Sequence, residues 1–332
     1  RDRGIMLFVV EEFHNIIKMD SNFMSDVSRL VRDESKVMVI LSCSSVAWVE
    51  NSMVKAMGNY AFNINAFMKL KEFSYSDFIN RFHNTEPREL LYIYAITGGN
   101  PGYVDRWNEN ISIKENICRL FLTDKGAWYK EALNYVKDEF REISVYNTIL
   151  SCLAMGKNKL NELYQHTGFS RAKISVYLKN LMELELVEKV FSLDTPGRDN
   201  QRKAVYRISH PLVRFWFCFL YADSSLLLRM TPLAYYEQLV EPALTIYCES
   251  CFSKVCQEYM QRENARHSLP IEITEFGSFA GKAGSIDYIG HNESGRYIVA
   301  FADYRDPVFL YEKYLQAKAL TGQAGIRPDY MY

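Results

Sequence analysis

With 332 residues, 48% of them hydrophobic and 24% charged, the chain has the composition of an ordinary globular protein and the length of two or three domains. Its net charge of −1 excludes a global basic field that would attract nucleic acid, so any nucleic-acid site must be a local patch. No apolar run reaches the roughly 18 residues of a membrane span, so no membrane partner is expected. The seven cysteines at irregular spacing predict reduced thiols in a cytoplasmic protein.

The first predicted element is a strand over residues 6–10, MLFVV, which runs directly into Glu11 and Glu12. An unbroken apolar run predicts a strand buried on both faces of a parallel α/β sheet, where ligands bind at the carboxyl ends of the strands. The pattern is typical of a Walker B strand, in which one acid holds Mg²⁺ and the next polarises the attacking water. The alternative is a core strand that ends in a solvated acidic turn.

A glycine-rich GxxxxGK[ST] loop does not occur in the sequence, although such a phosphate-binding loop precedes its Walker B strand. ATP and Mg²⁺ are therefore expected as cofactors only if the loop exists upstream of this chain. The alternative is that the loop has been lost.

A βαβ unit is predicted from the first strand, a helix over residues 21–33 with Ser21 as its N-cap, and a second buried strand over residues 36–41. The second strand ends in Ser42-Cys43-Ser44-Ser45. In a nucleotide-binding sheet, a hydroxyl of Ser42 or Ser44 would sense the γ-phosphate. The alternative is that these serines cap the next helix.

The next segments predict helices separated by a glycine turn. Residues 70–78 predict a short strand that enters a capped helix, and residues 89–96 predict a further helix. The sequence TGGNPG then ends that helix at Gly98 and Gly99 and opens another with Pro101.

The order of VVEEF, LSCSS, LKEFSYSDF and AITGGNPGYV resembles the archaeal-type ATPases, a branch of the STAND-like AAA+ P-loop proteins. The resemblance implies part of a P-loop α/β core over residues 1–78 and a helical lid over residues 79–142. It also implies that Glu11 holds the metal, that Glu12 is the catalytic glutamate, and that Pro101 couples the nucleotide to the lid.

Several positions depart from the pattern of that family. Glu11 stands where the family usually has aspartate, and Cys43 replaces the glycine of the sensor strand. Asn63 and Ile64 align with a pair of arginines, and an arginine that stabilises phosphate charge can be worth about 10³-fold or more in rate. These departures favour weak or absent hydrolysis.

Residues 143–222 predict a winged helix-turn-helix. Helices are expected over residues 146–153 and 159–166, and a third helix follows Ser170 with Ile174, Leu178, Leu181 and Leu184 on one face. Strands over residues 187–191 and 204–208 would form the wing. The same family carries such a module, in which an aspartate usually stands at the position of His210. Phosphate contacts are expected from Arg171, Lys173, Lys179, Arg198, Arg202 and Lys203. The alternative is a protein-interaction module with a solvated basic face.

Residues 223–332 predict helices over 232–264, strands over 271–273, 285–289 and 296–302, and a helix over 309–320. This order resembles the PD-(D/E)XK restriction-endonuclease-like domain that the family carries here. Asp287 matches the first acid, but Phe301 and Asp303 align with the glutamate and lysine of the second motif, and Ser253 with the helix glutamate. The resemblance therefore implies a nuclease-like fold without nuclease activity. Cys248, Cys251 and Cys256 are interpreted as buried thiols, because no fourth metal ligand is evident.

These elements predict an α/β multidomain protein that consists of a partial AAA+ core, a helical lid, a winged helix and a nuclease-like domain. The expected function is that of an ATP-binding ATPase whose nucleotide state controls a winged helix that binds double-stranded DNA. The alternative is a degenerate ATPase that serves as a DNA- or protein-binding scaffold, with a protein partner or a second copy of the chain. An active nuclease is the third class, and it would require DNA cleavage that depends on Asp287.

Overall fold

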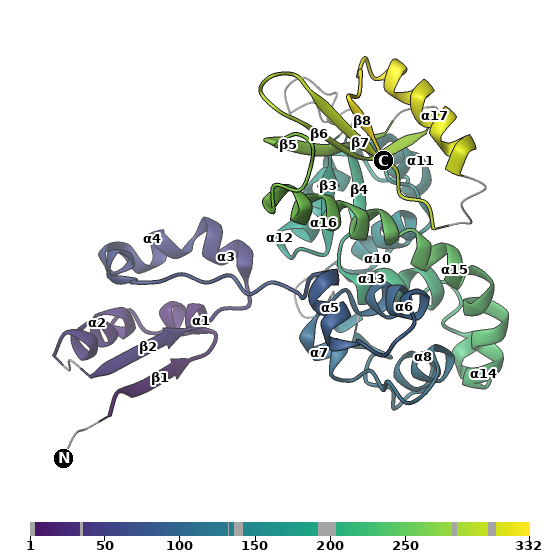
Figure 1. Cartoon of the computed structure of the whole chain (residues 1–332). Coiled ribbons are helices and arrows are strands. Elements are labelled where there is room, and N and C mark those ends of the chain that lie inside the picture. Colours follow the sequence, from purple (N-terminus) through teal and green to yellow (C-terminus); the bar gives the residue numbers. More distant parts are fainter. Residues whose placement is uncertain are drawn as a thin grey trace. The chain divides into compact units, whose positions relative to one another are not determined.

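The computed structural model describes residues 4–33, 36–131, 133–135, 142–191, 204–280, 284–304 and 310–332. The chain divides into two compact units, which are visible in Figure 1. The first comprises Arg1–Lys71 with Lys179–Glu185, and the second comprises Glu72–Leu178 with Leu186–Tyr332. In the described ranges, none of the helices has the length and apolar character needed to cross a lipid bilayer.

The first unit is built on two parallel strands, β1 (Met6–Val10) and β2 (Val37–Leu41), whose register runs from Met6 opposite Val37 to Val10 opposite Leu41. The predicted βαβ connection is confirmed, because helix α2 (Phe23–Asp33) lies between the strands. A short helix that the sequence did not predict, α1 (Phe13–Met19), follows β1 directly. The unit is completed by α3 (Val46–Asn51), α4 (Met53–Met57) and the 3₁₀ helix η1 (Gly58–Asn63).

The prediction that both strands are buried on two faces is wrong for the described chain. Met6, Leu7 and Val9 of β1 are more than half exposed, and β2 alternates between exposed and partly buried residues. The core of this unit is a cluster of Phe13, Met24 and Met57, against which Val10 and Leu41 at the ends of the two strands also pack. An apolar run indicates that a strand can be buried, but burial requires layers on both faces of the sheet.

The second unit begins with helices that the sequence largely anticipated. The predicted strand before Ser74 is wrong, because residues 64–74 have no regular structure and Leu70 is exposed. The capped helix predicted here is confirmed, and its cap, which the sequence interpretation did not name, is Ser74 in a capping box with Asp77. The helices of this region are α5 (Tyr75–Arg81), α6 (Pro87–Thr97), α7 (Pro101–Val104) and α8 (Ile113–Phe121).

Helix α6 lies at the centre of the second unit. All eight residues from Leu90 to Thr97 are buried, and α6 contacts α5, α8, α13 (Pro211–Phe219) and α15 (Glu241–Glu249). A helix that is apolar all round is stable only where other elements cover every face. The helix ends at Gly98, whose φ of 65° gives the left-handed cap that the Gly-Gly pair predicts. Pro101 then opens α7, also as predicted.

The winged-helix elements form in the predicted order. Ile174, Leu178 and Leu181 are at most 1% exposed, which confirms the apolar face of the third helix. Leu184 lies just beyond the end of that helix and is partly exposed. The elements are α10 (Ile143–Ala154), α11 (Leu160–Thr167), α12 (Arg171–Glu183) and the antiparallel strands β3 (Val187–Val190) and β4 (Val205–Ile208).

His210 begins the exit helix α13 in the role that an aspartate would fill. Its Nδ1 accepts a hydrogen bond from the backbone N–H of Val213 at 3.3 Å, so the ring proton lies on Nε2, which faces the hydroxyl of Tyr103 at 3.5 Å. The ring of Tyr135 also packs on His210, at 4.9 Å between centroids, and its hydroxyl lies 3.1 Å from that of Tyr103. Burial lowers the pKa of His210 to about 4, so the imidazole is a neutral cap.

The chain then forms short helices before its four-stranded sheet. These are η3 (Leu226–Leu228), α14 (Pro232–Tyr235), the π-helical turn η4 (Tyr236–Val240) and α16 (Phe252–Ala265). The sheet order is β5-β6-β7-β8, with β8 parallel to β7 and the other pairs antiparallel. Its elements are β5 (Glu275–Ala280), β6 (Ser285–His291), β7 (Tyr297–Ala300), α17 (Leu310–Gln323) and β8 (Tyr330–Met331).

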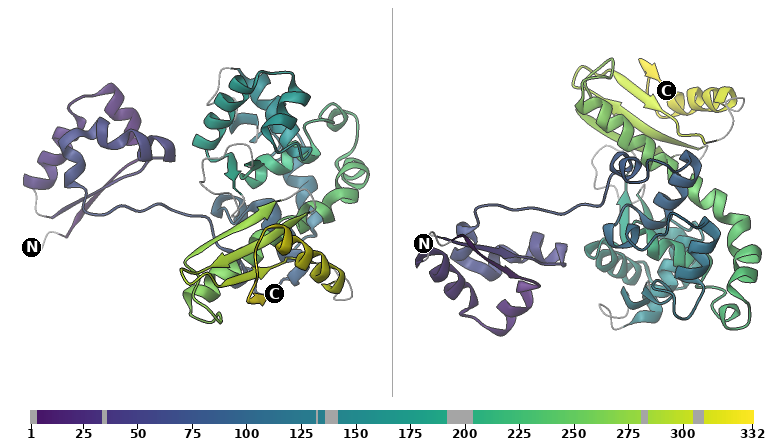
Figure 2. Two further views of the ribbon diagram at one scale, coloured as in Figure 1. Left: turned by 90° about the horizontal axis from the view of Figure 1, so that it is seen from above. Right: turned by 60° about the horizontal axis from the view of Figure 1, so that its bottom comes forward.

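The two faces of this sheet are covered by different helices (Figure 2). Tyr288 and Ile298 pack with Met260 of α16, whereas their neighbours Ile289 and Val299 pack with Leu320 of α17. This division follows from the two-residue alternation of side chains along a strand.

The predicted strand over residues 271–273 is wrong, because these residues have no strand structure. Ile271 and Ile273 are nevertheless buried, as the apolar pattern indicated, and they pack against the face of the sheet that α16 covers. The first strand of the sheet begins instead at Glu275, and the short strand β8 was not predicted.

Candidate functional site

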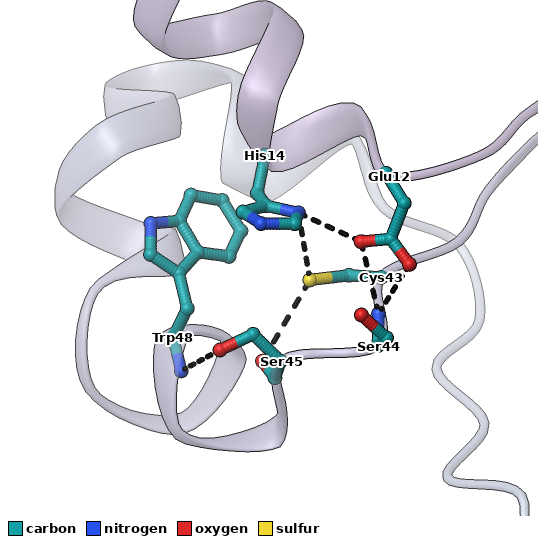
Figure 3. Close-up of polar contacts among 6 residues, drawn as sticks. All are labelled: Glu12, His14, Cys43, Ser44, Ser45 and Trp48. Carbon is teal, nitrogen blue, oxygen red and sulfur yellow. Dashed lines mark hydrogen bonds and ion pairs between the residues drawn. The ribbon is translucent and has the colours of Figure 1, made fainter. Parts of the chain in front are cut away.

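The carboxyl ends of β1 and β2 meet at the edge where the sequence predicts a ligand site (Figure 3). Two backbone hydrogen bonds hold the ends together: Ser42 N–H donates to the carbonyl of Val10 at 2.9 Å, and Phe13 N–H donates to the carbonyl of Ser42 at 3.2 Å. Glu11 is exposed, and Glu12 adopts a left-handed conformation with a φ of 52° that lets the chain turn into α1.

The carboxylate of Glu12 lies against Ser44, as the prediction of a shared site requires. The backbone N–H of Ser44 is 3.2 and 3.3 Å from the two carboxylate oxygens. Ser42 is exposed and connects the strand ends through its backbone. The alternative that this serine-rich segment caps the next helix is confirmed through its last residue, because Ser45 Oγ accepts a hydrogen bond from Trp48 N–H at the start of α3.

Two side chains to which the sequence interpretation gave no ligand role lie at the centre of this edge. His14 Nδ1 is 3.2 Å from Glu12 Oε2 and 3.2 Å from Cys43 Sγ, and its ring packs on Trp48 at 5.4 Å between centroids. Burial raises the pKa of the Cys43 thiol, a backbone hydrogen bond at Ser45 lowers it, and the charge of Glu12 raises it again. The position of Cys43, two residues after β2, was a signal that could have identified it, whereas His14 is brought here by the unpredicted helix α1.

The other residue predicted to contact nucleotide, Pro101, belongs to the second unit. It is exposed in the first turn of α7, where Asn100 caps the helix by accepting a hydrogen bond from Gly102 N–H at 2.9 Å. Its role in nucleotide coupling stays a prediction.

The recognition helix α12 carries its predicted basic residues on its exposed and partly exposed sides. Arg171 Nε donates to Asn161 at 3.0 Å, and its guanidinium lies 4.3 Å above the ring of Tyr164. Lys173 Nζ is 3.5 Å from a carboxylate oxygen of Glu142. These contacts between elements fix the start of α12 while leaving Arg171 exposed.

The remaining basic residues of the winged helix are less constrained. Lys179 is 73% exposed, and its Nζ lies 3.8 Å from Glu183 one turn further along α12. Arg207 is exposed on β4, opposite Glu188 of β3. The predicted wing contacts Arg198, Arg202 and Lys203 lie outside the described residues.

The nuclease-like site predicted at Asp287 is occupied by structural hydrogen bonds. Asp287 Oδ2 accepts a hydrogen bond from the backbone N–H of Ala302 at 2.9 Å. Helix α16 faces this point through Gln257, whose Nε2 donates to the carbonyl of Asp287 at 2.6 Å. Ser253 lies one turn earlier, and Asp303 follows β7 in a partly exposed position. The side chain that α16 brings to Asp287 is therefore a neutral amide.

One cysteine of the C-terminal helices contacts a partly buried arginine. Cys248 is buried as predicted, but the prediction of burial is wrong for Cys251 and Cys256, which are only partly buried. The Sγ of Cys251 lies 2.9 Å from Nη1 of Arg214, and Nη2 of Arg214 donates to the carbonyl of Tyr247. None of the seven cysteines, all of which lie in the described ranges, takes part in a disulfide bond.

Comparisons with known proteins agree with part of this description. Residues 147–189 match the bacterial regulatory protein arsR family, and residues 216–307 match a family of archaeal and bacterial proteins of unknown function. An uncharacterized protein of Methanocaldococcus jannaschii is 24% identical over 300 residues, which cover 87% of this chain and 65% of the relative. The chain thus spans less than two thirds of the length of that relative. No solved structure matches the chain.

The arsR match runs from within α10 to within β3, so the sequence comparison and the fold agree that this segment is a winged helix-turn-helix. The second match begins within α13 and extends past β7. It assigns no activity to the sheet.

Proposed function

We propose that the chain binds double-stranded DNA through its winged helix, with α12 in the major groove. The observation that carries the proposal is the exposed side of α12, where Arg171, Ser175 and Lys179 follow one another at one-turn intervals opposite the buried Ile174 and Leu178. In helix-turn-helix proteins the second helix of the motif reads the groove with its N-terminal residues, and arginine is the commonest specific contact.

The surroundings of Arg171 support this role. Its contacts with Asn161 and Tyr164 of α11 already restrict the side chain in the free protein. Binding therefore costs less side-chain conformational entropy. Val176 is 56% exposed on α12 and offers an apolar contact of the kind that a thymine methyl accepts. The nearby Glu142, which contacts Lys173, opposes phosphate binding.

Titration of a fluorescently labelled DNA duplex of mixed sequence tests the proposal. We expect binding whose log affinity falls linearly with the log of salt concentration, and we expect Arg171→Glu to weaken it by about tenfold or more. Arg327→Glu, which makes the same charge change at an exposed position after α17, is the control and should have little effect. Absence of binding, or equal losses in the two variants, would reject the proposal.

A second candidate function is ATP binding and hydrolysis, as part of a longer protein that supplies a P-loop. It is supported by the position of Glu12 and Ser44 at the carboxyl ends of adjacent parallel strands. The oxygen atoms of Glu11, Glu12, Ser42 and Ser44 suit Mg²⁺ and phosphate. In this proposal Glu11 holds the metal, Glu12 accepts the proton of the attacking water, and a serine hydroxyl contacts phosphate. Pro101 would then transmit the nucleotide state to the winged helix.

Hydrolysis by the full-length gene product, compared with its Glu12→Gln variant, tests this second function. We expect the variant to retain ATP binding and to lose activity by about 100-fold or more, because an amide cannot accept the proton. Glu293→Gln, in the exposed turn between β6 and β7, is the matched control. If neither wild type nor variant binds ATP, the alternative of a degenerate scaffold that binds DNA or protein is correct.

Nuclease activity has no comparable support. The order α16-β5-β6-β7-α17-β8 fits a nuclease-like domain, but Asp287 is engaged by Ala302 N–H, and α16 presents Gln257 beside it. If the chain is a degenerate scaffold, we propose that it binds a protein partner or a second copy of itself.

A further inference from the structure

Three side chains of different chemistry converge where β1 and β2 end. They are the carboxylate of Glu12, the imidazole of His14 and the thiol of Cys43, and one ligand atom of each lies within 4.8 Å of the other two. A search of the described residues for three or more His, Cys, Asp or Glu side chains with ligand atoms this close together finds this set. Figure 3 shows that all three point into the space beside the loop that contains Ser44 and Ser45.

We propose that Glu12, His14 and Cys43 form a binding site for a borderline-soft divalent cation, of which Zn²⁺ is the type. In a tetrahedral zinc site, ligand distances of about 2.0–2.3 Å separate neighbouring ligand atoms by about 3.3–3.6 Å. His14 Nδ1 lies 3.2 Å from both Glu12 Oε2 and Cys43 Sγ. Small side-chain adjustments therefore bring all three atoms to coordinating distance.

The chemistry of the ligands distinguishes this ion from the Mg²⁺ of a nucleotide site. Thiolate sulfur and imidazole nitrogen favour zinc and its first-row neighbours, whereas Mg²⁺ and Ca²⁺ require oxygen ligands. Three protein ligands leave one tetrahedral position for water or another small ligand, as in catalytic rather than structural zinc sites. The partial exposure of the Glu12 side chain, at 44%, gives that position access to solvent.

The backbone positions the three ligands before any ion arrives. The hydrogen bonds between Val10 and Ser42 and between Ser42 and Phe13 fix the two strand ends that carry them. The N–H of Ser44 orients the carboxylate of Glu12, and the ring of Trp48 supports His14. Such outer contacts to ligands typically change metal affinity by about 10–100-fold.

The site does not depend on the proposed nucleotide function. Binding of the cation would occupy the carboxylate of Glu12, so the same residue could not accept a proton from water at the same time. The test below uses metal alone, and its outcome is separate from that of the ATP experiment.

The test is titration of the reduced, metal-free chain with Zn²⁺ by calorimetry and with Co²⁺ by absorption. We expect one equivalent to bind, and we expect the Co²⁺ form to show thiolate-to-cobalt charge transfer and the intense visible bands of tetrahedral coordination. Cys43→Ser should abolish the charge-transfer band and weaken Zn²⁺ binding by about 100-fold or more, because a hydroxyl is a poor zinc ligand. Mg²⁺ in excess should not displace the ion.

Two further variants keep the result interpretable. Glu12→Gln changes a partly exposed side chain and should weaken Zn²⁺ binding even if Cys43→Ser fails to fold. Cys118→Ser removes a partly buried thiol in α8 of the second unit and should leave binding unchanged. The proposal is overturned if the wild type binds no Zn²⁺, if Cys43→Ser binds it as tightly, or if Cys118→Ser removes the charge-transfer band.

Discussion

Replacement of Gly98 by alanine is expected to destabilise the second unit by about 3 kcal/mol, because two unfavourable effects combine at this position. The φ of Gly98 is 65°, a left-handed conformation that costs an alanine roughly 1 kcal/mol or more. In addition, an alanine Cβ would overlap Cγ of Pro211, in the first turn of α13. The proline ring is rigid and cannot rotate away, so α6 and α13 must separate.

The matched control is Gly156→Ala, in the turn between α10 and α11. Gly156 has a φ of 79°, but a Cβ there would meet no atom within 4 Å, so this variant should show only the conformational cost of about 1 kcal/mol. Urea denaturation followed by tryptophan fluorescence measures both variants. Equal losses of stability would show that the contact between Gly98 and Pro211 does not limit packing.

Acidification from pH 6.5 to 4 is expected to remove about 3 kcal/mol of stability through His210. The folded protein holds the pKa of this imidazole at about 4, because burial disfavours its charged form, whereas the unfolded chain has the ordinary value of about 6.5. Between these values the unfolded state binds more protons than the folded state. Stability from this group is therefore complete above pH 6.5 and is lost as the pH falls towards 4.

His210→Asn isolates the contribution of this one group. Asparagine is a good N-cap and can accept the hydrogen bond from Val213 N–H, but it does not titrate. Burial raises the pKa of the Tyr103 phenol, which packs on the ring, so Tyr103 carries no charge in this range. The free energies of unfolding of wild type and variant should converge or cross as the pH falls, and parallel pH curves would contradict the assignment.

Local signals in the sequence predicted the elements whose cause is local. The capping box at Ser74, the Gly98 cap and the apolar face of α12 follow from contacts within one helix or turn, so short patterns reveal them. The exposure of β1 does not follow from its own residues, because it depends on what packs against the sheet. Residues 271–273 show the same limit: their burial was predictable, but their lack of a pairing strand was not.

The candidate site was predictable to a similar extent. Glu12 and Ser44 were brought to one edge by the parallel register of two strands, which the βαβ pattern indicated. The contact of His14 with Cys43 depends on the unpredicted helix α1, which turns His14 back over the end of β2. In the C-terminal domain, the sequence alignment assigned Ser253 to the helix position that faces Asp287. The structure places Gln257 there instead. The two residues are four positions apart, about one helical turn, and an alignment without local motifs does not distinguish adjacent turns.

The burial of α6 on every side has a consequence for how the second unit unfolds. Helices α5, α8, α13 and α15 share α6 as their common contact, so none of them can separate without exposing it to water. We therefore expect the lid, the winged helix and the C-terminal helices to unfold together, although their boundaries in the sequence are distinct. Loss of α6 removes the support of all four neighbours together, which makes unfolding of the helical part cooperative.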